Sequence, residues 1–210
     1  MAQMLNLQSH QGDVEDAGEA AEEDVLRDEK LSRDQKAKAL QDFLFMAASN
    51  GDAQRIQRLV RGAASEFVQI DAVDAEGTPP IVYASCFGHK DVVLGLLNAG
   101  ATVDQQDRNQ WTALMWAMTN RHKDIAKTLL DHGASTEIKS SSGRTALDFV
   151  SPNSEMSDFL QHSGYTIGNA GVTDDFYNAG FSQDRFEEEL AESEMRRRMM
   201  MESAMNLEVD

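Results

Sequence analysis

The chain has 210 residues, a net charge of −17 and a single cysteine, Cys86. One cysteine excludes an intrachain disulfide and a cysteine-cluster zinc site, and no run of apolar residues reaches the roughly 18 that span a membrane. The acidic excess disfavours direct binding to nucleic acid and to anionic membrane surfaces. The first ten residues also lack the charged start and apolar run of a secretory signal. We therefore expect a cytoplasmic or nuclear chain without membrane insertion.

The negative charge is concentrated at the two ends of the chain. Residues 1–35 contain ten acidic and three basic side chains, net −7, and residues 166–210 contain eleven and four, also −7. The part between them contains fifteen and twelve, net −3. Segments this polar bury too little apolar surface to offset their ordering entropy. We predict an acidic disordered arm over residues 1–35, with a transient helix around 19–38, and ordered structure from near Leu40.

A fixed period runs through the middle of the chain. Its length is the spacing from Ile81 to Leu114, which is repeated from Leu114 to Leu147, and Ala84 and Ala117 are separated by the same interval. Apolar residues at helical spacing predict two helices in each period. A fixed period of this size indicates a solenoid, in which one pair of helices stacks on the next.

The motifs within this period resemble those of the ankyrin repeat. Thr112-Ala113-Leu114 matches the start of the first helix, Gly88-His89 matches the turn between the helices, and residues 96–101 and 129–134 match the Leu-Leu-x-x-Gly-Ala exit. The resemblance implies an all-α solenoid of helix pairs joined by short β-hairpin or turn connections. It also implies structural hydrogen bonds between units from His89 and His122.

This resemblance organises the chain into a repeat domain and its flanks. We predict four units over residues 36–165, with the terminal units acting as caps, then a linker over 166–182 and an acidic, Met-rich helix over 183–206. Acidic flexible arms flank the solenoid. The tail also resembles the segment after the repeats in fungal proteins that join ankyrin repeats to a dilute-type domain, although this chain contains no dilute domain.

Two turns of the third unit depart from the family pattern. Gln110 replaces the hairpin glycine and Arg121 replaces the glycine between the helices. Both place a Cβ where the backbone favours positive φ, which predicts local strain. In the second unit, Pro79 stands where the family has a threonine whose hydroxyl ties the hairpin together. We therefore predict a less well fastened hairpin there.

The sequence contains no grouping of residues that indicates an enzyme. No pair of histidines has the i,i+4 spacing of a metal-binding helix, and the acidic run 187–189 points around a helix rather than toward one ion. Cys86 has no activating base near it in the sequence, so a packed thiol is expected. We predict no catalytic, cofactor-binding or metal site.

In the ankyrin family, partners contact the hairpin tips and the concave face of the first helices. The resemblance therefore implies the following partner-binding residues: Glu76, Tyr83, Phe87, Arg108, Asn109, Trp111, Trp116, Thr119, Asn120, Arg144 and Phe149. Three of them, Tyr83, Trp116 and Phe149, recur once in each period and form either an aromatic ladder on this face or part of the core. Trp111 lies on a hairpin at a position that normally faces outward, so we predict an exposed binding hot spot there.

These observations favour a non-enzymatic protein–protein interaction module, monomeric, that holds a protein partner on its concave face. A chaperone or escort of a basic client protein, binding through the acidic arms, is an alternative. A regulatory N-terminal part of a larger trafficking protein is another.

Overall fold

The computed structural model describes residues 21–151 and 153–165. Helices are the regular structure of this part of the chain, which confirms the all-α prediction. The helices and 3-10 turns are α2 (Arg33–Asn50), α3 (Ala53–Arg61), η1 (Ala63–Glu66), α4 (Pro80–Phe87), α5 (Lys90–Asn98), α6 (Ala113–Thr119), α7 (Lys123–Asp131), η2 (Ala146–Phe149) and α8 (Glu155–His162). Extended pairing in the described residues amounts to one antiparallel bridge, between Gln106 and Thr112.

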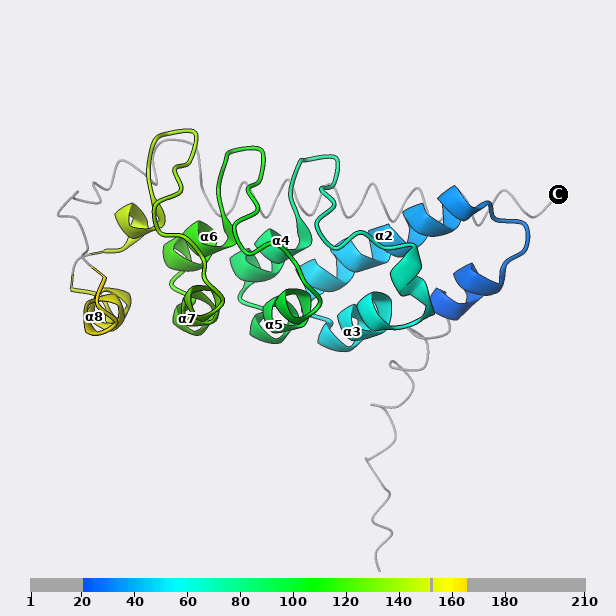
Figure 1. The fold of residues 1–210 in the computed structure, drawn as a ribbon, viewed down its shortest axis with the longest axis horizontal. Helices are drawn as coiled ribbons and strands as arrows, with labels where there is room; N and C mark the ends of the chain where they lie inside the picture. The colour runs from blue at the N-terminus through cyan, green and yellow to red at the C-terminus, as the bar shows by residue number, and fades with distance from the viewer. Residues whose placement is uncertain (1–20, 152, 166–210) are drawn as a thin grey trace, which may run out of the picture. The chain divides into compact units, whose positions relative to one another are not determined.

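The helices stack in two rows (Figure 1). The first row contains α2, α4, α6 and η2, in which neighbours pack side by side, and the second contains α3, α5 and α7, likewise side by side, followed by α8. Three loops that end in hairpins extend from the edge of the first row, at the top of Figure 1. The turns between the two helices of each unit form the other edge. Within the described segments, no helix combines the length and apolar character that crossing a membrane requires.

Apolar residues from both rows form one continuous core. Leu44, Ile56 and Ile81 are fully buried in the first two units, as are Leu114 and Leu129 in the third. Each unit is too small to bury its own apolar face, so the faces of successive units cover one another. The matched positions of the sequence period are thus the contacts between units.

Histidine and glycine interlock at the inter-helix edge. Gly51 and Gly88 have φ of 79° and 84°, and a Cβ on them would lie 2.6 Å and 2.9 Å from the rings of His89 and His122 respectively. Each imidazole Nε2 also donates to a main-chain carbonyl of the preceding unit, at 2.9 and 3.0 Å. The predicted structural role of both histidines is confirmed. Glycine is required here both for its conformation and for the space that the next imidazole takes.

The two replaced glycines of the third unit keep the left-handed conformation. Gln110 has φ of 59° and Arg121 has φ of 60°, so the predicted strain is confirmed. Arg121 precedes a unit in which Ser154, instead of a histidine, caps the second helix. A Cβ at residue 121 therefore meets no imidazole of the kind that excludes one at Gly88.

The prediction of a disordered arm is wrong for residues 21–35. Residues 21–27 are helical, and α2 begins at Arg33 behind a capping box formed by Ser32 and Gln35. The rest of the predicted arm, residues 1–20, lies outside the described residues, as do the predicted linker over 166–182 and helix over 183–206.

A buried ion pair holds this N-terminal helix against the first unit. The Glu22 carboxylate is 5% exposed, and its oxygens lie 2.9 Å from Arg55 Nε and 3.3 Å from Arg58 Nε. The Lys36 ammonium also donates to the carbonyl of Leu26, at 2.7 Å. Net charge alone pointed to disorder, but one carboxylate placed between two guanidinium groups provides the attraction that orders the segment.

The fourth unit, which the sequence predicts as a cap, is abbreviated. Its first helix is reduced to the single turn η2, and α8 follows with Ser154 as its N-cap. Met156 and Leu160 of α8 are buried.

Candidate partner-binding surface

Each hairpin is closed by one polar residue at its base. These residues are Asp74, Asp107 and Ser140, one period apart, and each donates its main-chain N–H to the carbonyl four residues on, at 3.2, 2.9 and 2.8 Å. In return, each side-chain oxygen accepts the main-chain N–H of that same residue, at 2.9, 2.9 and 3.3 Å. The hairpins therefore have one internal design, repeated three times.

The second carboxylate oxygen binds an aromatic side chain nine residues on. Tyr83 donates its hydroxyl to Asp74 Oδ2 at 2.5 Å, and Trp116 donates its indole N–H to Asp107 Oδ2 at 3.0 Å. In the fourth unit the two positions hold Ser140 and Phe149, which lack the second acceptor and the donor respectively. In each unit, therefore, an aspartate at the hairpin base stands with an aromatic residue that can donate a hydrogen bond, and a serine stands with one that cannot. The second hairpin is fastened by Asp74, although Pro79 makes no side-chain cap as Thr112 does.

The three repeated aromatic residues belong to the core. Tyr83, Trp116 and Phe149 are 3%, 5% and 8% exposed. Of the two alternatives weighed from the sequence, the core position is the one observed, and these rings do not form a ladder on an open concave face. Their polar atoms are turned toward the hairpin bases, where a buried donor finds the acceptor it requires.

Trp111 is also buried, so the prediction that it faces outward is wrong. Its exposed fraction is 5%, and its ring centroid lies 4.7 Å from that of Trp116 and 4.5 Å from that of Phe149. The hairpin directs this side chain into the gap between the third and fourth units. The equivalent residues share the inward direction: Thr78 is buried, and the guanidinium of Arg144 lies over the Phe149 ring at 5.7 Å.

Asp107 is the most perturbed acid of the described hairpins. Burial raises the pKa of its carboxyl above the ordinary value of 3.8. Hydrogen bonds from the main-chain N–H of Trp111, the Trp116 indole and the main-chain N–H of Asn109 act in the opposite direction, as does the charge of Arg108. Desolvation is the larger effect, because the carboxylate is 7% exposed.

The remaining predicted site residues are exposed or half-buried, and all of them except Phe87 are polar. Arg108 is exposed, and the half-buried members of the set are Glu76, Phe87, Asn109, Thr119, Asn120 and Arg144. Among the described residues, Val73 is the one large apolar side chain that is substantially exposed, at 50%. A concave apolar stripe, which the sequence suggested, is therefore absent from this part of the chain.

Several of the half-buried residues have internal partners. The Thr119 hydroxyl donates to the carbonyl of Met115 at 2.9 Å, and the Asn120 amide donates to the carbonyl of Cys86 at 2.8 Å. These two side-chain donors are thus used within the solenoid. Arg108 and Asn109 lie at the tip of the third hairpin, where the Arg108 side chain is exposed.

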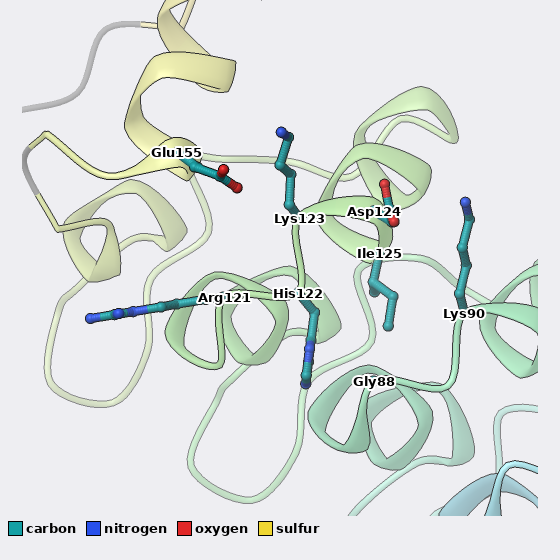
Figure 2. A pocket seen from close by; sticks show the side chains of 8 residues that line it. All are labelled: Gly88, Lys90, Arg121, His122, Lys123, Asp124, Ile125 and Glu155. Atoms are coloured by element: carbon teal, nitrogen blue, oxygen red, sulfur yellow. The ribbon is translucent and has the colours of Figure 1, made fainter.

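The sequence reasoning missed an open groove on the inter-helix edge (Figure 2). It has a volume of about 430 Å³ and is lined by Gly88, Lys90, Arg121, His122, Lys123, Asp124, Ile125 and Glu155. A second groove of about 360 Å³ shares Lys123 and Glu155 and adds Asp158, Phe159 and His162. The available signal was the recurrence of lysine at positions 90 and 123, one period apart. Within the residues that the structure covers, no three His, Cys, Asp or Glu side chains are placed to hold a metal ion.

Comparison with known proteins agrees with this architecture. A model of ankyrin repeats in three copies matches residues 44–140 and 96–168, which together span 125 of the 210 residues. No curated protein matches the chain. The resemblance of the tail to fungal proteins with a dilute-type domain has no support from these matches. Because the repeat model covers more than half of the sequence, and the stacked helix pairs and hairpins are those of its fold, the chain belongs to the ankyrin-repeat family.

Proposed function

We infer that this chain, as a member of the ankyrin-repeat family, is a protein–protein interaction module. We propose that this chain is a non-enzymatic binding module that contacts its protein partner through the tips of its hairpins, with Arg108 and Asn109 at the centre. The observation that carries the proposal is the contrast within the third hairpin. Its apolar side chain, Trp111, is buried, while Arg108 is left in solvent.

Hydrogen bonds between adjacent hairpins support this proposal, because they hold the tips in fixed positions. The N–H of Ser141 donates to the carbonyl of Asn109 at 3.1 Å, and Gln106 Nε2 donates to the carbonyl of Lys139 at 3.2 Å. Nearer the helices, the N–H of Ser135 donates to Asp104 Oδ1 at 2.9 Å. A surface that is already ordered loses less conformational entropy when it binds.

The chemistry of the tips favours a polar partner surface that offers acceptors. A guanidinium presents five N–H donors in a planar fork that fits carboxylates and paired carbonyls. Arg108 is therefore suited to a carboxylate or to the carbonyl groups of an irregular segment. A partner that depends on a large apolar anchor is disfavoured, since the described surface has no cluster of exposed apolar side chains to receive one.

Affinity purification with mass spectrometry would identify the partner, and calorimetry with the purified partner would then test the surface. We expect Arg108→Glu to weaken binding by about tenfold or more, since it places a like charge against the partner's acceptors. Lys127→Glu is the matched control, because it makes the same charge change at an exposed position of α7, away from the hairpins. If Lys127→Glu abolishes binding while Arg108→Glu leaves the affinity unchanged, the partner does not bind at the hairpin tips.

The charge distribution favours a second candidate, the chaperone or escort of a basic client. Residues 1–35 and 166–210 each carry a net charge of −7. Binding through them would weaken steeply as salt rises, because exposed charges more than about 10 Å apart are screened at 0.1 M ionic strength. Binding that survives both high salt and removal of residues 1–35 and 166–210 would exclude this candidate.

A further inference from the structure

The inter-helix edge presents a regular row of side chains. The second helix of each unit begins at the same place, so the first residues of α3, α5, α7 and α8 follow one another along the edge. These residues are Ala53, Lys90, Lys123 and Glu155. The last three line the larger groove, with their side chains extending from successive helix starts (Figure 2).

These three charges are not used in holding the solenoid together. Lys90, Lys123 and Glu155 are exposed, and within the described part of the chain none of them makes an ion pair. Lys127 on the same helix α7 differs, because its ammonium lies 2.9 Å from the Asp131 carboxylate. The row therefore has the pattern positive, positive, negative, and it remains available to a partner.

The spacing of the row fits one kind of peptide backbone. Packed helices lie about 8–10 Å apart, so the starts of α5 and α7, which pack against each other, are separated by about that distance, and Glu155 at the start of α8 lines the same groove. A polyproline II helix has three residues per turn and rises about 3.1 Å per residue, which places residues i and i+3 on one face about 9 Å apart. A β-strand points residues i and i+3 to opposite faces and does not match.

We propose that the inter-helix edge is a docking site for a polyproline II segment of a protein partner. The segment carries acidic, acidic and basic side chains at three-residue intervals, which face Lys90, Lys123 and Glu155 in that order. This surface is separate from the hairpin tips, so the proposal goes beyond the function argued above. The chain would then have two opposite edges for recognition, one formed by hairpins and the other by helix starts.

The other residues of the two grooves fit this occupant. Asp158 lines the smaller groove together with Glu155 and adds a second negative charge at that end of the row. Phe159 of α8 is half-buried in the smaller groove and offers an apolar surface to proline rings. Asp124 is a second acidic residue in the lining of the larger groove, besides Glu155, and it follows Lys123 directly in the sequence.

Two fluorescein-labelled peptides of identical composition test the charge order. The matched peptide is Glu-Pro-Pro-Glu-Pro-Pro-Lys-Pro-Pro, and the scrambled peptide is Glu-Pro-Pro-Lys-Pro-Pro-Glu-Pro-Pro. Fluorescence anisotropy with the full chain at low salt measures both affinities. We expect the matched peptide to bind about fivefold to tenfold more tightly, because the scrambled order turns two weak surface attractions into repulsions. The scrambled order mismatches the row in either chain direction.

A charge exchange within the row provides the decisive variant. Lys123→Glu combined with Glu155→Lys keeps the net charge and changes the row to positive, negative, positive. It should invert the preference, so that the scrambled peptide binds more tightly. The matched control is Lys127→Glu combined with Asp131→Lys, an exchange on α7 outside the row, which should leave the preference unchanged. Thermal melting by circular dichroism checks that both variants remain folded.

Three results would overturn the proposal: equal affinities of the two peptides for the wild-type chain, no binding of either, or an unchanged preference in the row exchange. Arg108→Glu separates this site from the proposed function. It lies on the hairpin edge and should not alter peptide binding, whereas it should weaken binding of the hairpin partner. Failure at one edge is therefore distinguishable from failure at the other.

Discussion

Substituting Tyr83 by Phe removes the phenol hydroxyl from the second hairpin and tests the hairpin design directly. The ring is 3% exposed and its hydroxyl lies 2.5 Å from Asp74 Oδ2, so the change deletes one hydrogen bond to a carboxylate without opening a large cavity. Hydrogen bonds to charged groups contribute about 1.5–3 kcal/mol. We expect the free energy of unfolding to fall by about 2 kcal/mol, and the melting temperature by on the order of 5–10 °C.

Urea denaturation followed by circular dichroism measures this loss, and Tyr165→Phe is the matched control. Tyr165 is the last described residue and no side-chain hydrogen bond ties its hydroxyl to the solenoid, so its loss should cost less than about 0.5 kcal/mol. Adding Asp74→Ser to Tyr83→Phe recreates the Ser140–Phe149 pair of the fourth unit in the second. The double variant should lose about 1 kcal/mol less unfolding free energy than the sum of the losses of Tyr83→Phe and Asp74→Ser measured singly. Equal costs for the two tyrosines, or strict additivity, would refute the reasoning.

Three further predictions concern stability. Arg121→Gly should raise the free energy of unfolding by about 1 kcal/mol, because glycine adopts the positive φ of this turn without strain. Its counterpart Gly88→Ala should lower the free energy of unfolding by about 2 kcal/mol, because the added methyl group would lie 2.9 Å from the His122 ring. Glu22→Ala should cost about 2 kcal/mol, less than a fully buried pair, since the Arg55 and Arg58 side chains it leaves are 17% and 27% exposed. Asp107→Ser should cost more at acid than at neutral pH. The folded-state pKa of Asp107 is raised, so between the folded and unfolded pKa values the folded protein holds a proton that the unfolded chain has released. Protonation therefore favours the folded state, and the contribution of Asp107 to the free energy of unfolding grows as the pH falls toward 3.8.

Chemical denaturation also decides these three predictions. If Arg121→Gly destabilises the protein, then the arginine side chain makes contacts that outweigh its backbone strain. If Glu22→Ala leaves both stability and protease resistance of residues 21–32 unchanged, the N-terminal helix is not held by its carboxylate. If the cost of Asp107→Ser shrinks as the solution is acidified, the hydrogen bonds to this carboxylate outweigh its desolvation.

The stacking of the units was predictable from the sequence because it depends on periodic apolar contacts. Leu114 and its counterparts recur once in each unit, and helices that bury one face on a neighbouring unit must repeat their apolar positions at the unit length. The conformations of Gln110 and Arg121 were predictable for a related reason. Turn geometry is common to all units, so a residue that replaces a glycine takes the φ of the turn.

The direction of Trp111 was not predictable from its place on a hairpin. What buries it is Phe149 of the next unit, and a residue covered by the next unit looks the same in sequence as one left in solvent. One signal did exist. An aspartate stands nine residues before Tyr83 and before Trp116, and a serine stands nine residues before Phe149, as expected if donor and acceptor are matched inside the protein.

The order of residues 21–35 was hidden for a similar reason. Glu22 and Arg55 are far apart in the sequence, and no local pattern links them. Composition averages over a segment, while the free energy gained from one buried carboxylate between two guanidinium groups depends on a single position. A polar segment can therefore be ordered by one specific contact that its mean composition does not reveal.

Several positions of the repeat pattern in this solenoid are explained by a residue elsewhere in the solenoid. Aspartate bonds a donor aromatic in two units, and serine stands with phenylalanine in the fourth, while glycine makes room for the next unit's histidine. Such pairs are explained by internal packing and need no ligand. A departure that has no internal counterpart is different, because packing does not account for it. The exposed charges at the starts of α5, α7 and α8 are of this second kind, and partner recognition is a constraint that would place them in register along one edge.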